Sequence, residues 1–270
     1  MNGYPVYIEG IGLLGPALNN WADAAPVLRG ESAYTPAPLQ LPAPEALPAA
    51  ERRRAGTAIK LSMAVATEAV RQAGADPATL PNVFSSTGGD CENCHAILEV
   101  LASSERLISP TRFHNSVHNA PAGYWSIATQ CTAASTSLCT YDATFGAGLL
   151  ETIAQAVAGG ERCLLVAFDT AYPEPLHAQR PIPYAFGVGM VINPVRTDAT
   201  QAAITLSLTE DAVTTVPDAA LETIRGSIPA ARSLPLLQLL ASGRQGRVVI
   251  DYIEPFNLAI EVSAAIEVSA

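Results

Sequence analysis

Alternation between two kinds of apolar pattern is the feature that most limits the fold of this chain. Short β-branched runs, such as Val6 to Gly12 and Cys163 to Phe168, have the composition of buried strands. Between them lie longer segments with apolar residues at helical spacing, as in Thr57 to Ala73 and Thr144 to Ala158. Strands that alternate with helices favour a layered α/β domain with a largely parallel sheet.

The same patterns predict further elements along the chain. Strands are expected at 83–86, 135–140, 187–193, 204–208 and 248–253, and helices at 95–101, 122–129 and, interrupted by two prolines, 219–241. Residues 248–253 and 258–262 are expected to form a hairpin around Pro255. The last twelve residues repeat the hexapeptide AIEVSA, as either an edge hairpin or a processing feature.

Composition limits the class of protein. With 49% hydrophobic and 15% charged residues among 270, the chain is expected to fold rather than to be disordered. A net charge of −10 argues against nucleic acid or an anionic membrane as a partner. Short apolar runs and the absence of a signal-peptide pattern at 1–21 favour a cytoplasmic protein. Five scattered cysteines are typical of reduced thiols rather than of a disulfide framework.

The segment Cys91-Glu92-Asn93-Cys94-His95 matches the motif that attaches c-type haem. Haem attachment requires export, for which no signal is seen, and zinc would require two more ligands, for which only His114 and His118 are on offer. We therefore expect no cofactor and no metal here. The two thiols are expected to flank a helix start that follows a turn at 88–90.

His114 and His118 lie four residues apart, a spacing that would place both on one face of a helix. Metal binding or acid–base catalysis is one interpretation. No glutamate follows the first histidine as in the zincins, and no nucleophile precedes them in a known elbow. Hydrogen bonding within a polar loop is therefore the favoured interpretation.

The most informative stretch runs from Ser135 to Phe145, where a strand pattern passes directly into a long apolar helix. Such a turn exposes one side chain at a helix N-terminus, where free N–H groups and the helix dipole favour negative charge. A cysteine there would be an activated thiolate, but the residue at this turn is Asp142. An aspartate can serve as an N-cap, a contact worth about 1 kcal/mol.

Taken together, these segments resemble the N-terminal half of a β-ketoacyl synthase, which has the thiolase-like fold. The resemblance is greatest to the short chain-length-factor type found in bacterial polyene pigment clusters. It covers residues 6–194 and rests on these motifs: the strand Val6 to Gly12 with Gly15-Pro16, the helix Lys60 to Gly74, Ser109 to Phe113, Asn119 to Gly123, the turn at Asp142, and Gly159-Gly160 leading into Cys163 to Asp169. Spacings from Asn119 and from Gly159 both place the family's nucleophile position on Asp142.

The departures from the family pattern bear on activity. Active members use one cysteine as the acyl acceptor and two histidines that come later in the chain. This chain has Asp142 in place of that cysteine, and its last histidine is His177. Neither Cys131 nor Cys139 falls at the expected helix start. The resemblance therefore implies a subunit that does not catalyse condensation by itself.

What the resemblance implies in its place is a partner subunit. The strand before the turn would pair across a two-fold axis with an active ketosynthase, or with a second copy, and its candidate interface residues are Ser135, Ser137, Cys139 and Thr140. Thr111, Arg112 and Phe113 would form walls of the partner's acyl tunnel. The implied pathway is fatty-acid or polyketide synthesis, specifically of aryl polyenes, and an acyl carrier protein is a further possible partner.

The expected fold is thus a thiolase-like half, residues 1–194, with a C-terminal helix and hairpin extension, residues 195–270, packed on the same domain. Two other functions stay open. In one, a small thioester hydrolase or acyltransferase uses Asp142 to activate water or to orient His114 or His118. In the other, the chain is an acyl or coenzyme A binding module, although Lys60 is the only lysine and no phosphate-binding loop is seen.

Overall fold

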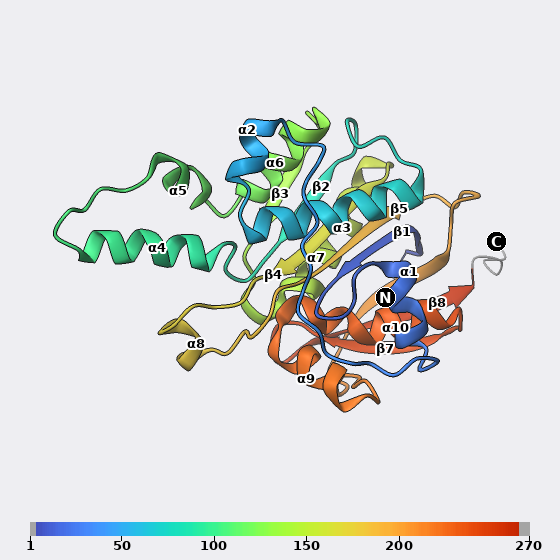
Figure 1. Cartoon of the computed structure of the whole chain (residues 1–270). Helices are drawn as coiled ribbons and strands as arrows, with labels where there is room; N and C mark the ends of the chain where they lie inside the picture. The colour runs from blue at the N-terminus through green and yellow to red at the C-terminus, as the bar shows by residue number, and fades with distance from the viewer. Residues whose placement is uncertain (1–3, 265–270) are drawn as a thin grey trace.

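One eight-stranded mixed sheet runs through residues 4–264, which are the residues that the computed structural model describes (Figure 1). In spatial order its strands are β3 (Ser135–Leu138), β2 (Asn82–Ser85), β4 (Cys163–Asp169), β5 (Phe186–Asn193), β1 (Val6–Leu14), β6 (Ala202–Thr209), β8 (Asn257–Ala264) and β7 (Gly246–Asp251). The expected layered α/β class is confirmed, and the sheet is mixed.

Helices cover the sheet and form its connections. They are α1 (Trp21–Leu28), α2 (Ala49–Arg54), α3 (Thr57–Ala73), α4 (Cys91–Ala102), α5 (Pro110–Asn115), α6 (Ala120–Thr129), α7 (Thr144–Gly159), α8 (Leu176–Gln179), α9 (Ala219–Ser227) and α10 (Leu234–Ser242). Two 3-10 turns, η1 (Tyr141–Ala143) and η2 (Pro229–Ser233), precede α7 and α10. The two best helical patterns of the sequence thus correspond to α3 and α7.

The expectation of a largely parallel sheet is wrong. Among the described strands, only β2 makes parallel pairings, with β3 and β4, and the other five pairings are antiparallel. A parallel return needs a crossover connection, commonly a helix of several turns. The segment between β4 and β5 contains only the short α8, and β7 and β8 are joined by a tight turn, so both pairs run antiparallel.

Glycines in the central strands let α3 lie directly on the sheet. A Cβ added at Gly12 would lie 2.1 Å from the carbonyl oxygen of Val65, and one added at Gly10 would lie 2.0 Å from that of Ala69. Both carbonyls belong to α3. The strand and the helix backbone therefore touch at positions where only glycine fits.

Side chains of β4 alternate between two apolar layers. Leu164 and Val166 pack with α3 on one face, whereas Cys163 and Leu165 join the core cluster that contains Phe145 of α7 on the other. This alternation is expected of a strand covered on both faces. It places α3 and α7 on opposite sides of the sheet.

Residues after 194 extend the same sheet and cover the face that carries α7. The strand β6 pairs with β1, and β7 and β8 form the expected hairpin. Leu221 of α9, Ala230 of η2 and Leu237 of α10 lie buried in the core cluster that contains Phe145 of α7. The domain division at 194 stays a prediction. The first AIEVSA copy ends β8, and the second, 265–270, lies outside the described residues.

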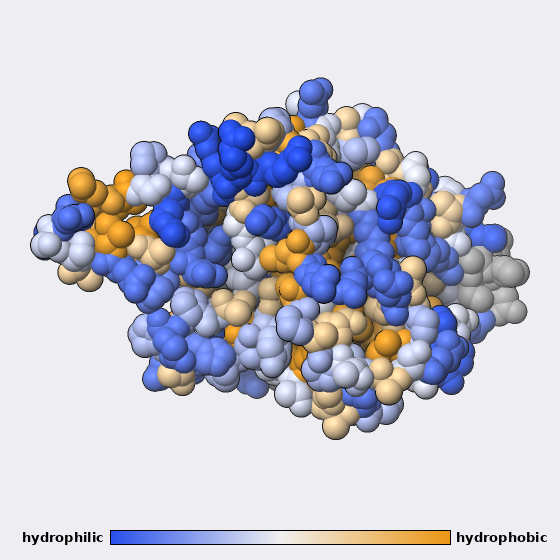
Figure 2. Space-filling view, viewed as in Figure 1, coloured by the Kyte–Doolittle hydropathy of each residue, from blue (hydrophilic) through white to orange (hydrophobic). Residues whose placement is uncertain are grey.

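Helices α4 and α5 project from the body of the molecule at the left of Figure 1. No residue of α4 is buried, and Leu98, Leu107 and Phe113 on this projection are 62%, 77% and 65% exposed. Figure 2 shows apolar side chains gathered on it. No helix within 4–264 has both the length and the apolar character that crossing a membrane would require.

Candidate functional site

The bend between β3 and α7 carries Asp142, as expected from the sequence. Asp142 lies in η1, one residue before Ala143, which caps α7. Tyr141 before it has a φ of 52°, in the left-handed region that a residue other than glycine rarely adopts. The backbone carbonyl oxygen of Thr144 accepts a hydrogen bond of 2.7 Å from the hydroxyl of Ser85, which fixes the start of α7 to β2. The bend is thus a strained turn that a hydrogen bond from β2 holds in place.

The expectation that Asp142 caps α7 is wrong, because no side chain caps the N-terminus of this helix. The Asp142 carboxylate instead contacts two guanidinium groups. Arg180, from the segment between α8 and β5, donates to one carboxylate oxygen. Arg232 of η2 lies 3.2 Å from the other and also donates to the Asp142 carbonyl oxygen at 3.1 Å. The negative charge at the bend is therefore neutralised by remote residues.

Other groups hold Arg180 in place. Its guanidinium donates to the hydroxyls of Thr87 at 2.8 Å and Tyr172 at 3.2 Å. It also stacks over the ring of Tyr141, 3.8 Å from the ring centre, as a cation–π contact. The side chain is 20% exposed. Arg180 is thus oriented by the bend itself and by two hydroxyl groups.

Arg232 belongs to a chain of alternating charges. It lies 3.4 Å from Asp251 at the end of β7, and Asp251 in turn lies 3.2 Å from Arg225 of α9. Arg225 also pairs with Glu222 at 2.7 Å. This chain joins the bend to the segments after residue 194.

Asp169, at the end of β4, is a buried carboxyl group behind the bend. It accepts backbone N–H groups of Thr87 at 2.7 Å and Ala230 at 2.8 Å. Burial raises the pKa of Asp169 to about 7, against the opposing effect of these two hydrogen bonds. It therefore ties the turn after β2 to η2, the element that carries Arg232. No sequence pattern pointed to a role for Asp169.

No thiol occupies the bend. Cys139 lies just after β3, with its sulfur 3.2 Å from the carbonyl oxygen of Thr87. Cys91 and Cys163 are shielded from water, and burial raises their thiol pKa values to about 11 and about 12. These two cysteines are protonated at neutral pH and lack the thiolate that acyl transfer requires.

The Cys91-to-His95 motif forms the first turn of α4, and its side chains diverge. The sulfur of Cys91 points to the carbonyl of Gly88 at 3.4 Å, that of Cys94 to Ser116 at 3.9 Å, and His95 pairs with Glu99 at 3.4 Å. Within residues 4–264 no group of three or more potential metal ligands comes together. The thiols flank a helix start, as expected.

The expectation that the two histidines hydrogen-bond within one polar loop is wrong, because His114 lies in α5 and His118 bonds to a residue outside its own segment. His118 makes a hydrogen bond of 2.9 Å to the carbonyl oxygen of Ser86, and His114 packs edge-on against Tyr124 with ring centres 6.3 Å apart. Asp142 makes its polar contacts with Arg180 and Arg232 rather than with either histidine ring.

Of the remaining candidates, Phe113, Ser135 and Ser137 line adjoining hollows on a surface formed by α5, α6 and β3, here called the β3 surface. Helix α5 carries Thr111, Arg112 and Phe113. A hollow of about 480 Å³ includes Phe113, and one of about 310 Å³ beside it includes Ser135 and Ser137. The two hollows share Asn119 and Gly123, and β3 is one of the two edge strands of the described sheet.

Thr140 lies between β3 and the bend, directly before η1. Its hydroxyl is buried and has no hydrogen-bond partner among residues 4–264. The structure therefore brings Phe113 and the serines of β3 to one surface, whereas Cys139 and Thr140 lie beyond the strand, nearer the bend.

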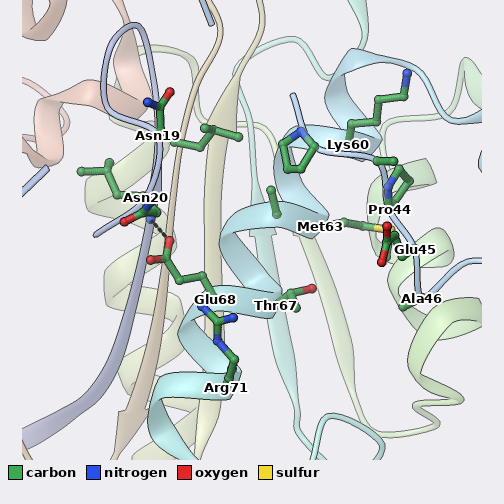
Figure 3. Close-up of a pocket in the computed structure, with 15 residues that line it drawn as sticks. Asn19, Asn20, Pro44, Glu45, Ala46, Lys60, Met63, Thr67, Glu68 and Arg71 are labelled. Atoms are coloured by element: carbon green, nitrogen blue, oxygen red, sulfur yellow. Dashed lines mark hydrogen bonds between the residues drawn. The ribbon is translucent and has the colours of Figure 1, made fainter. Parts of the chain in front are cut away.

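A separate hollow of about 480 Å³ lies between α3 and residues 42–46 (Figure 3). Glu68 points to one end of it, and its carboxylate accepts the backbone N–H groups of Leu13 at 3.0 Å and Trp21 at 2.8 Å. Burial raises the pKa of Glu68, against the effect of these bonds. Lys60 lies at the other end. Glu68 holds the connection from β1 to α1, which is a structural role.

Comparisons with known proteins place this geometry in context. A family model described as β-ketoacyl synthase, N-terminal domain, matches residues 23–249. A chain from the complex of ketosynthase ApeO with its chain length factor ApeC, from Xenorhabdus doucetiae, is 23% identical, with a TM-score of 0.72 over 95% of this chain and 98% of that one.

Two further solved structures are similar in fold. A chain of the ishigamide ketosynthase/chain length factor is 14% identical, with a TM-score of 0.69 over 97% of this chain and 99% of that one. A chain of the AntDE:AntF complex, a type II polyketide synthase acyl-carrier protein with its ketosynthase, is 12% identical, with a TM-score of 0.71 over 97% and 99%. No curated protein sequence matches the chain.

Proposed function

This chain belongs to the β-ketoacyl synthase family, and from that premise we propose that it is a non-catalytic subunit of the chain-length-factor type. The observation that carries the proposal is the ion-paired Asp142 at the bend where the family resemblance places a nucleophilic cysteine. A carboxylate that attacked a thioester would give an anhydride, which is a high-energy acyl donor. Here the carboxylate is also engaged by Arg180 and Arg232. Condensation would therefore belong to a companion chain.

The companion would be an active ketosynthase of fatty-acid or polyketide synthesis, and the class of product would be an aryl polyene. Support comes from the fold, which is similar to chains in two ketosynthase and chain-length-factor structures. A cytoplasmic location fits this role.

The β3 surface is the proposed contact with the companion. The outer edge of β3 makes no pairing within the described sheet, and an open strand edge readily accepts another strand. Beside it, Phe113 is 65% exposed and Val117 is 54% exposed. Exposed apolar residues around an open edge are typical of a protein interface. A second copy of this chain could use the same edge.

An acyl carrier protein is proposed as a further, transient partner. The whole chain carries −10, which repels an acidic carrier, but α2 ends in Arg52, Arg53 and Arg54. The carbonyl of Arg54 accepts a hydrogen bond from Asn115, so the end of α2 lies against α5, the helix that also carries Arg112. This local group of cations supplies the charge that an acidic partner requires.

We expect Phe113→Ala to change the length of the acyl product while pairing is retained, because one exposed ring contributes to the tunnel wall more than to a whole interface. The measurement is product mass from the co-expressed chain and cognate ketosynthase, with co-elution on size exclusion. Leu208→Ala is the matched control, because Leu208 is 57% exposed on β6, several strands from β3. Unchanged product length together with failure to co-elute in the unmodified pair would remove the proposal.

The hydrolase alternative requires Asp142 to activate water or to orient a histidine. Its carboxylate faces two guanidinium groups instead, and His118 bonds to Ser86. Steady turnover of acyl thioesters by the isolated chain, abolished in Asp142→Ala, would favour this alternative over the subunit role.

A further inference from the structure

The contacts of Asp142 are those of a bound carboxylate ligand rather than of a local turn. Its two carboxylate oxygens meet Arg180 and Arg232, which are separated from it by 38 and 90 residues. Two guanidinium groups that converge on one carboxylate form the pattern by which proteins recognise carboxylates. Both arginines are largely shielded, with side chains 20% and 17% exposed.

We propose that Arg180 and Arg232 form a carboxylate-binding site that this chain fills with its own Asp142. The side chain acts as a built-in ligand and closes the site to the carboxylate of an external molecule. This inference deepens the proposed function, on which it rests for the place of the bend, and it names the chemical class of ligand that the site accepts.

The distribution of charge shows why the site needs an anion. Among residues 4–264, Asp142 is the one carboxylate in an ion pair with Arg180, whereas Arg232 also pairs with Asp251. Asp169 also acts on Arg180 electrostatically, but it is buried behind the bend. Without Asp142, Arg180 would be a shielded cation with only hydroxyl and ring partners. Binding of an anion would stabilise this unpaired guanidinium group.

The site is exposed enough to bind a carboxylate from solvent once the Asp142 carboxylate is removed by mutation. The Asp142 side chain is 41% exposed, so an ion from solvent can reach its position. Asp142→Ala removes a carboxylate and leaves the β-carbon, and formate has the size of the missing group. Larger carboxylates, such as acetate and malonate, would project toward solvent along the exposed side.

The test is chemical rescue of the full-length Asp142→Ala protein, followed by thermal unfolding in formate, acetate or malonate against chloride at equal ionic strength. We expect saturable stabilisation with a dissociation constant in the millimolar range and a rise in Tm of about 3–5 °C at tenfold that concentration. The wild-type protein, whose site is filled, should show no carboxylate-specific shift. If the variant does not stay soluble, its refolding yield in formate against chloride is the readout.

Two matched variants make the outcome specific. In Asp142→Asn the amide fills the space, so rescue should be absent. In the double variant Asp142→Ala with Arg180→Gln, one guanidinium is lost and the affinity for formate should fall at least tenfold. Equal responses to formate and chloride in Asp142→Ala, or undiminished formate binding in the double variant, would overturn the proposal.

Pairing with the ketosynthase is measured separately on the same proteins. If formate rescues Asp142→Ala but no variant and no wild-type chain pairs with a ketosynthase, the subunit role fails and the carboxylate site stands. If pairing is intact and rescue is absent, the reverse conclusion holds.

Discussion

At the scale of single residues, one substitution alters the electrostatics of the bend. An aspartate where the family resemblance places a cysteine would leave an isolated charge if nothing else changed. Arg180 and Arg232 reach it from two distant segments, and Asp251 and Arg225 continue the alternation of charge. The position of Asp142 could be predicted from local patterning. Its partners could not, because sequence spacing does not indicate which arginines converge in space.

Asp169 should make the stability of the protein depend on pH. Its pKa is raised from 3.8 to about 7, so between about pH 4 and pH 7 the folded chain holds a proton that the unfolded chain has released. Stability should therefore fall as pH rises through this window, by on the order of 2–4 kcal/mol from this group. Urea unfolding of wild type and Asp169→Asn at several pH values measures it, and the difference between the two curves cancels other titrating groups. Parallel curves would contradict the assignment.

At the scale of elements, the contact between α3 and β1 is the most closely fixed part of the fold. The sequence predicted both elements correctly from their apolar patterns. The reason for glycine at positions 10 and 12 lies in tertiary structure, because the backbone of α3 contacts the strand at both positions. A glycine in a strand pattern indicates either a bulge or a close approach, and the sequence alone does not choose between them.

We expect Gly12→Ala to destabilise the protein by about 3 kcal/mol or more, because its Cβ would lie 2.1 Å from a backbone carbonyl that cannot rotate away. Gly226→Ala is the matched control, because a Cβ at this exposed position of α9 meets nothing within 4 Å. That substitution should be neutral or stabilising by up to about 1 kcal/mol, since alanine favours helix. Chemical denaturation measures both, and equal effects would disprove the close contact.

At the scale of the whole molecule, the sheet ends at two edge strands, β7 and β3. On the β7 side, Thr214 donates a backbone hydrogen bond of 2.8 Å to Val249, so part of that edge is covered. Residues after 194 add β6, β8 and β7 beside β1, and their helices cover the face that carries α7. The other side ends at β3, beside the projecting α4 and α5 (Figure 1). The β3 edge, which makes no pairing with another strand within residues 4–264, is the contact proposed for the partner.

Ser137→Pro should weaken pairing with a ketosynthase without disrupting the sheet. The carbonyls of Ala134 and Leu138 accept hydrogen bonds from Asn82 and Ser86, so by strand alternation the N–H of Ser137 faces the open edge. Proline removes that donor and is tolerated on an edge strand. We expect at least a tenfold rise in the dissociation constant, measured by light scattering or titration calorimetry. Ser137→Ala, which keeps the N–H, should pair normally, and equal pairing of both variants would exclude β3 as the contact.

The sequence by itself determined the features that depend on short segments: the helices α3 and α7, the strand β4, the hairpin of β7 and β8, and the place of Asp142 at a bend. Periodicity and turn residues act locally, so they can be interpreted without knowing the rest of the chain. Tertiary structure alone decided that most strand pairs are antiparallel, that α3 packs directly on the strand glycines, and that two arginines contact Asp142. These depend on which distant segments meet, and that is set by burial of the whole apolar surface rather than by any one segment.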